Sequence, residues 1–276
     1  MNYQNLLNAA LALAALGGAL GLVLALAARL FTVKTDEKLE AVTAALPGAN
    51  CGGCGYAGCS TYAQALVEGT AEANRCPVGG PAVHARLAEI MGMQLTQNKR
   101  LTAMVMCAGG QRARKKFDYV GLRDCHAAMR LGGGPLECAY GCLGLGTCVK
   151  TCPFHAIALV DGVAVVDHER CTGCLKCTKA CPKGIIRSVP YYQDVNVTCS
   201  SHEKGASLRR ICEIGCLGCR VCEKVCPHDA IHIDGNLAVI DFDKCVGCGD
   251  CAEKCPRKLI LDAKLDRGPR TMEEDA

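Results

Sequence analysis

The sequence contains no tryptophan and only four phenylalanines among its 276 residues. Aromatic side chains supply much of the buried area of globular cores, so their scarcity argues against a large apolar core in the C-terminal half of the chain. The sequence also contains no G-x-G-x-x-G after an expected strand, no P-loop, no H-E-x-x-H and no serine elbow. It therefore offers no nucleotide site, no zinc-peptidase site and no serine-hydrolase site.

Cysteine is abundant, with 24 residues, whereas the net charge of +4 is too mild to indicate nucleic-acid binding. A chain so rich in cysteine is either a disulfide scaffold from an oxidising compartment or a metalloprotein kept reduced. Disulfide frameworks scatter their cysteines, whereas here the bacterial iron–sulfur run C-x2-C-x2-C-x3-C-P recurs. The spacing favours a metalloprotein, in which metal binding supplies the folding free energy that a small core does not provide.

The N-terminal segment AALALAALGGALGLVLALAA, residues 9–28, has no charged side chain. A helix of this length spans about 30 Å, enough to cross the hydrocarbon of a bilayer. No Lys or Arg precedes the segment, whereas Arg29 and Lys34 follow it, which predicts an N-terminus outside and the remainder in the cytoplasm. A cleaved signal peptide is the alternative, but it would have a charged start and a shorter apolar run. We expect a protein that spans a cell membrane once.

A four-cysteine module with the spacing C-x2-C-x4-C-x16-C follows, formed by Cys51, Cys54, Cys59 and Cys76. Helices are expected around it at residues 34–45, 61–72 and 82–93. Zinc is the general alternative for any four-cysteine site. An iron–sulfur cluster is favoured because the rest of the chain has cluster-binding spacing.

Two repeated units occupy the rest of the chain. The first unit's cysteines recur 74 residues later, so that Cys152, Cys171, Cys174, Cys177 and Cys181 correspond to Cys226, Cys245, Cys248, Cys251 and Cys255. Between them, CPFHAIALVDGVAVVDHERC and CPHDAIHIDGNLAVIDFDKC align without a gap, and each has two β-rich runs around Asp161-Gly162 or Asp234-Gly235. The pattern predicts the ferredoxin plan, two cluster loops and two hairpins related by a pseudo-twofold axis, used twice.

In that plan the fourth cysteine of each run ligates the cluster of the other run. Three 4Fe-4S ligand sets follow: Cys216, Cys219 and Cys222 with Cys255; Cys245, Cys248 and Cys251 with Cys226; and Cys171, Cys174 and Cys177 with Cys152.

The run ECAYGCLGLGTCVKTCP, residues 137–153, departs from this spacing and reads C-x3-C-x5-C-x3-C-P. The 74-residue shift places Leu145 where Cys219 stands, so a ligand has been lost. Cys138 is the expected substitute, which gives the set Cys138, Cys142, Cys148 and Cys181. A looser loop would change the cluster's solvent exposure and hydrogen bonds, and hence its potential. A tolerated insertion is the alternative.

Four cysteines remain without a role: Cys107, Cys125, Cys199 and Cys212. They could build a sixth cluster from both repeats, remain buried or free thiols, or act as alternative ligands of the irregular cluster. The sequence therefore predicts five 4Fe-4S clusters and leaves a sixth open.

Together, these motifs resemble a known family. A spanning helix, CGGCGYAGC with the distant Cys76, CAYGCLGLGTCVKTCPFHAI and the following CTGC resemble the B subunit of the Rnf complex, a membrane-bound ferredoxin:NAD oxidoreductase that translocates sodium ions or protons. The resemblance covers essentially the whole chain, and the irregular run is the family's own form. Two repeated units make this chain similar to the longer members.

The resemblance implies a role in electron transport. The chain would accept electrons from reduced soluble ferredoxin, or return them, and relay them toward the other membrane and peripheral Rnf subunits. Nicotinamide, flavin and ion-pumping chemistry would belong to those partners, and no catalytic residue that bonds to substrate is expected here. Basic residues near the cluster loops could steer an acidic ferredoxin or form an ordinary solvated surface; they are Lys150, Lys176, Lys179, Lys183, Arg220, Lys224, Lys254, Arg257 and Lys258.

Two other functions stay open from sequence. One is a polyferredoxin subunit of another membrane oxidoreductase, of the hydrogenase or formate dehydrogenase type, and the other is a zinc scaffold or redox sensor. The expected fold class is α+β. The expected parts of the chain are a transmembrane anchor (1–31), an N-terminal 4Fe-4S module (32–93), ferredoxin-like unit 1 (94–190), ferredoxin-like unit 2 (191–265) and a polar C-terminal tail (266–276).

Overall fold

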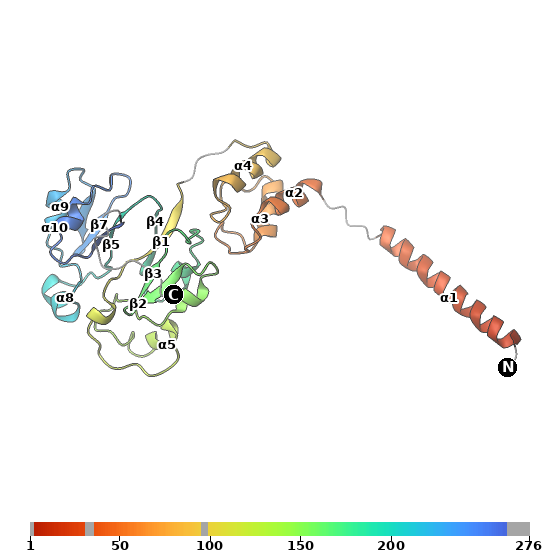
Figure 1. Cartoon of the computed structure of the whole chain (residues 1–276), viewed down its shortest axis with the longest axis horizontal. Coiled ribbons are helices and arrows are strands. Elements are labelled where there is room, and N and C mark those ends of the chain that lie inside the picture. The colour runs from red at the N-terminus through yellow and green to blue at the C-terminus, as the bar shows by residue number, and fades with distance from the viewer. Residues whose placement is uncertain (1–2, 31–35, 95–98, 264–276) are drawn as a thin grey trace.

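The computed structural model describes residues 3–30, 36–94 and 99–263, and it combines helices with short strands (Figure 1). The helices are α1 (Tyr3–Leu30), α2 (Glu37–Ala45), α3 (Cys59–Val67), α4 (Gly80–Met91), α5 (Cys125–Met129), α6 (Thr147–Thr151), α7 (Lys176–Ala180), α8 (Gly205–Ile211), α9 (Val221–Val225) and α10 (Asp250–Lys254), with a 3-10 helix at Gly110–Arg112. The strands are β1 (Leu101–Val105), β2 (Ile157–Val160), β3 (Val163–Val166), β4 (Ile186–Pro190), β5 (Val195–Val197), β6 (Ile231–Asp234), β7 (Leu237–Ile240) and β8 (Ile260–Asp262).

Helix α1 contains the apolar segment expected to span a membrane. Its window Leu11–Arg29 is long and apolar enough to cross a bilayer, and none of that window is buried against the rest of the protein. The helix lies apart from the other elements in Figure 1. A helix with leucine exposed on all sides lacks the polar face of a soluble helix, which supports membrane anchoring.

The N-terminal module consists of α2, α3 and α4 packed around one core. Val42, Tyr62, Leu66 and Leu87 are fully or almost fully buried there. Helix α3 starts two residues earlier and ends five residues earlier than predicted. It ends where Gly69 adopts a positive φ of 72°, a conformation that terminates helices.

Each repeated unit contains two antiparallel strand pairs, but only one of them is a hairpin. In unit 1 (94–190), β2 and β3 form the hairpin, whereas β1 pairs with the distant β4. In unit 2 (191–265), β6 and β7 form the hairpin, and β5 pairs with β8. The second hairpin predicted for each unit is therefore a long-range pair that joins the unit's first and last strands.

The two hairpin turns have the same backbone form. Asp161 and Gly162 have φ values of 45° and 79°, and Gly235 and Asn236 have 51° and 69°. Positive φ at both central residues matches the mirror-image turn that two-residue hairpins prefer. The first turn lies at the predicted position, and the second lies one residue later than predicted.

Units 1 and 2 are joined by backbone pairing and by a shared core. Ala113 of unit 1 forms an isolated bridge with Cys212 of unit 2, and the Arg114 amide donates to the Ile211 carbonyl at 2.8 Å. Buried side chains from both units belong to one hydrophobic cluster, among them Ala108, Ala113, Leu136, Val195, Leu208, Cys212 and Ile231. The two units therefore form a single packed body.

The tight packing of the loops of unit 1 can be tested by substituting two of its glycines. Gly173 and Gly184 both have positive φ, 71° and 62°, but a Cβ at Gly173 would lie 2.4 Å from the Leu101 carbonyl oxygen, whereas one at Gly184 meets nothing within 4 Å. Alanine at either position costs about 1 to 2 kcal/mol from the left-handed backbone. Gly173→Ala should cost about 2 kcal/mol more because it must displace β1. Urea unfolding followed by circular dichroism measures both, and equal midpoints would contradict this packing.

Candidate metal centres

Twenty of the 24 cysteines surround five separate cavities, four cysteines to each. The empty space in these cavities, including the part open to solvent, is 310 to 390 Å³ in every case. Similar size and an all-thiol donor set indicate one kind of occupant. In the described part of the chain no three Cys, His, Asp or Glu side chains converge as a single-ion site. Thiols spread around a space suit a cluster with several iron corners.

Three of the five cavities bring together the sets expected from the regular runs. Each is lined by one predicted quartet: Cys216, Cys219, Cys222 and Cys255; Cys226, Cys245, Cys248 and Cys251; Cys152, Cys171, Cys174 and Cys177. In each run the third cysteine is the second residue of a five-residue helix, α7, α9 or α10. The residue before each helix has positive φ, which turns the chain around the cavity.

The irregular run has the same backbone as the regular ones. Gly144 and Gly146 have φ values of 68° and 77°, close to the 63° and 61° of Gly218 and Arg220 in unit 2. Each loop also presses against the turn of its own hairpin: a Cβ at Gly144 would lie 2.5 Å from the Gly162 oxygen. The loop is therefore not looser than the regular ones, and Leu145 occupies the place of the middle cysteine.

Cys125 occupies the missing position in this cavity, which is lined by Cys125, Cys142, Cys148 and Cys181. It is the first residue of α5, and its amide donates to the Thr147 hydroxyl oxygen at 2.7 Å. Thr147 in turn donates to the Asp124 carboxylate at 3.0 Å. Helices α5 and α6 are thus tied together at the place where the fourth thiol is needed.

Cys138 does not lie beside Cys142, Cys148 and Cys181, where the sequence placed it. It lines a different cavity, together with Cys107, Cys199 and Cys212. The segment before the irregular run pairs backward with residues 114–115, since the Glu137 amide donates to the Arg114 carbonyl at 2.9 Å and Leu136 bridges Lys115. This pairing carries Cys138 to the junction with unit 2. The sequence did hold one signal of this: Cys138 and its repeat partner Cys212 both lie outside the regular motif.

The N-terminal module positions its four cysteines around α3. Cys76 is buried, and Cys54 and Cys59 pack against the same core. Burial raises the pKa of the Cys76 thiol, and the nearby Cys51 and Cys54 thiols raise it further. The Asn50 side-chain oxygen accepts from the Cys59 amide at 2.8 Å and so fixes the start of α3. Cys51, Cys54 and Cys76 are therefore neighbours, and Cys59 packs against the same core.

Burial also controls the protonation of the thiols in the two units. It raises the pKa of Cys142, Cys148, Cys177 and Cys251 to about 12, so these thiols are protonated at neutral pH in the absence of metal. Iron ligation requires thiolates, so loading must release protons. Amide groups already point at several sulfurs, for example Gln193 Nε2 at 3.0 Å from Cys245 Sγ.

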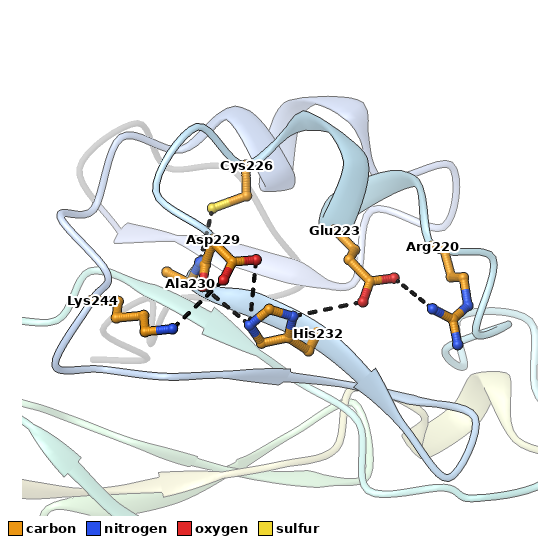
Figure 2. A network of polar contacts seen from close by, with 7 residues as sticks. All are labelled: Arg220, Glu223, Cys226, Asp229, Ala230, His232 and Lys244. Carbon is orange, nitrogen blue, oxygen red and sulfur yellow. Dashed lines mark hydrogen bonds and ion pairs between the residues drawn. The ribbon is translucent and has the colours of Figure 1, made fainter.

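Two cysteines, Cys219 and Cys248, are exposed, and both belong to unit 2. A network of polar contacts in the same unit joins α9 to β6 (Figure 2): Arg220 contacts Glu223 at 3.1 Å, and His232 lies between Glu223 and Asp229. Lys244 reaches Asp229 at 3.6 Å and completes the chain of contacts. Exposed pairs of this kind add little stability, but they fix the side chains beside the cluster loops.

Several of the basic residues near the cluster loops have partners within the chain. Lys183 donates to the carbonyl oxygens of Gly133 and Ala139, at 2.8 and 2.7 Å. The Arg257 guanidinium donates to the Cys212 carbonyl at 2.7 Å. These two side chains hold loops around the cavities, so they contribute to the architecture of the sites as well as to their charge.

Three family models match the chain. One, described as "Putative Fe-S cluster", matches residues 46–78, and two, each described as "4Fe-4S dicluster domain", match residues 137–186 and 215–259. The matches cover the N-terminal module and the cluster loops of both units. With the six groups of four cysteines, they define an iron–sulfur protein with several cluster sites and one candidate membrane helix.

Curated relatives narrow this class to one family. The B subunit of the Na(+)-translocating ferredoxin:NAD(+) oxidoreductase complex of Acetobacterium woodii is 48% identical over 87% of this chain and 74% of its own length. The B subunit of the ion-translocating oxidoreductase complex of Methanosarcina acetivorans is 42% identical, with 92% and 97% covered. The B subunit of the proton-translocating ferredoxin:NAD(+) oxidoreductase complex of Clostridium ljungdahlii is also 42% identical, with 82% and 80% covered. The chain therefore belongs to the family of B subunits of ion-translocating oxidoreductase (Rnf) complexes, which confirms the resemblance seen in the sequence.

The hydrogen bonds that hold Cys125 in place, which we call the anchor of Cys125, can be tested by substituting Asp124, the N-cap of α5. Its carboxylate accepts from the Ala127 amide and the Thr147 hydroxyl, and these hydrogen bonds lower its pKa. The anchor is therefore present above the ordinary carboxyl pKa and is lost only as the pH falls through the lowered value. Asp124→Ala should release iron to a chelator several-fold faster at neutral pH. Asp118→Ala, which removes only an exposed pair with Lys115, is the control; equal release rates would contradict the anchor.

Proposed function

We propose that this chain is the iron–sulfur electron-transfer subunit of an ion-translocating ferredoxin:NAD oxidoreductase. The observation that carries the proposal is the set of six cysteine quartets, five of them around cavities of similar size, in a chain whose family is that of the Rnf B subunits. A hydrogenase-type or formate-dehydrogenase-type polyferredoxin is not favoured, because the similarity to the Rnf relatives extends over the N-terminal module and nearly the whole of the Methanosarcina protein.

The number of clusters in this proposal is six. Five ligand sets are the N-terminal quartet, the three regular quartets, and the irregular set completed by Cys125 in place of Cys138. The sixth set consists of Cys107, Cys138, Cys199 and Cys212, which line one cavity between the units. Four thiols around each space are the donor set that 4Fe-4S clusters require. The domain boundaries in this proposal are those expected from the sequence: 1–31, 32–93, 94–190, 191–265 and 266–276.

The residues of the chain have distinct tasks in this function. Bound 4Fe-4S clusters supply one-electron chemistry, and the protein sets where each one sits. Burial shields some of the sulfurs from water, such as those of Cys171 and Cys177. Amides donate to the sulfurs and tune potentials, as Ala230 does to Cys226 Sγ at 3.4 Å and Ala103 to Cys171 Sγ at 3.5 Å.

The partners in this proposal are reduced soluble ferredoxin and the other subunits of the complex. The α1 helix anchors the chain, with its N-terminus outside and the cysteine-rich parts on the cytoplasmic side, because the basic residues follow the apolar segment. One relative is named for sodium and another for protons, at 48% and 42% identity to this chain. Overall similarity of this chain to its relatives therefore does not decide the coupling ion.

Iron and acid-labile sulfide per chain test the function directly. Anaerobically purified protein should contain about 24 of each, from six 4Fe-4S clusters, and dithionite should produce the low-temperature EPR signal of reduced clusters. Stoichiometric zinc with little iron would contradict an electron-transfer role and favour a zinc scaffold.

Cys125 and Cys138 line two different cavities, so substitutions of these two cysteines should cause additive losses of iron. Cys125→Ser and Cys138→Ser should each remove one cluster, about four irons, and the double variant should remove about eight because two separate sites are broken. If both cysteines served one site, the double variant would lose no more iron than either single variant. Cys125→Ser combined with Cys181→Ser, two residues of one cavity, is the matched control and should lose about four irons.

A further inference from the structure

The quartet between the units takes two cysteines from each of them. We call Cys107, Cys138, Cys199 and Cys212 the interface site. Cys138 and Cys212 are equivalent under the 74-residue shift, and Cys107 and Cys199 each follow the first strand of their unit, β1 or β5, by two residues. The interface site therefore takes equivalent residues from the two units and belongs to neither alone.

The interface site is hydrogen-bonded to the nearest site on either side. The Cys142 amide donates to Cys107 Sγ at 3.3 Å, and the Cys216 amide donates to Cys199 Sγ at 3.4 Å. Cys142 is a residue of the irregular site in unit 1, and Cys216 is a residue of a regular site in unit 2. A ligand residue of each neighbouring site thus contacts a sulfur of the interface site directly, and the two contacts mirror each other.

Inside each unit the two sites are also neighbours, and the N-terminal module lies beside one site of unit 1. In unit 1 helix α6, which contains Cys148, packs against helix α7, which contains Cys177, and in unit 2 helix α9, with Cys222, packs against α10, with Cys251. At the far end of unit 1, the N-terminal module touches Cys174, since a Cβ at Gly53 would lie 3.0 Å from the Cys174 Cα. Of the five cavities lined by four cysteines, the interface site is the one that takes its cysteines from both units.

We infer that the interface site is the single bridge for electrons between the two units, so that the six sites form one unbranched row. The row begins in unit 2, where Cys219 and Cys248 are exposed to a soluble donor, and ends in the N-terminal module, which follows the membrane helix in the sequence. Each step moves one electron: the donor is oxidised by one electron, the acceptor is reduced by one, and no bond forms or breaks. The inference rests on the proposed function.

The test is the rate at which a soluble donor reduces a chain that lacks the bridge. Full-length Cys138→Ser/Cys212→Ser protein, purified anaerobically in detergent, should retain about 20 irons. On mixing with reduced bacterial 2[4Fe-4S] ferredoxin in a stopped-flow spectrometer, visible bleaching should have a fast phase limited to the two sites of unit 2, about two-fifths of the total. The wild-type chain should bleach almost entirely in the fast phase.

The matched control removes a site from the end of the row. Cys51→Ser/Cys76→Ser protein should also lose about four irons, yet nearly all of its bleaching should stay fast because the other five sites remain connected. A fast phase well above two-fifths in the interface variant would overturn the inference. If the double variant loses more than one cluster, Cys138→Ala alone is read by the same criterion. Wild-type protein without iron would instead refute the proposed function itself.

Discussion

The structure depends on one constraint, the burial of cysteine thiols around cavities that the chain cannot fill with its own side chains. Cysteines are members of the cores of both units, next to residues such as Ile157 and Ile231. Burial raises the pKa of several of these thiols to about 12, so the metal-free protein is left with protonated thiols facing empty space. Metal binding replaces the missing packing and stabilises the thiolates, which couples folding to cluster loading. This is why a chain with so few aromatic residues can support two packed units.

The sequence predicts the parts of the sites that are local and repeated. Cys171, Cys174 and Cys177 lie within seven residues, so their shared cavity follows from the run itself, and the repeat then supplies Cys152. The remaining cysteine of the cavity lined by Cys142 could not be found in this way. It is Cys125, whose amide donates a hydrogen bond to Thr147, 22 residues further along the chain. Proximity in sequence favoured Cys138, but strand-like pairing of Glu137 with Arg114 turns that thiol toward unit 2. The long-range strand pair β1–β4 was missed for the same reason, since no local pattern specifies it.

Leu145 clarifies what the irregular run changes and what it keeps. The backbone conformation of the loop is retained, including the close approach of Gly144 to the hairpin turn at Gly162. Only the origin of one thiol differs, so the cavity remains lined by four cysteines while one of them comes from a separate segment, α5. A ligand on its own helix can have different hydrogen bonds and exposure from one held within the loop, and both properties set a cluster's potential. The departure from regular spacing is thus a change of ligand source and not a loss of the site.

The junction between the units explains why both of them need cysteines outside the regular motif. A ferredoxin-like unit with two sites is closed by its own first and last strands, so two such units in a row would have no site in common. Cys107 and Cys199, placed just after the first strands, and Cys138 and Cys212, placed just before the cluster loops, provide that common site where Ala113 pairs with Cys212. The shared core holds the four thiols in a fixed relation, because moving either unit would break backbone hydrogen bonds between the units. In the proposed relay, the residues that join the two units in space would also connect them for electron transfer, so a substitution that loosens the junction should affect both.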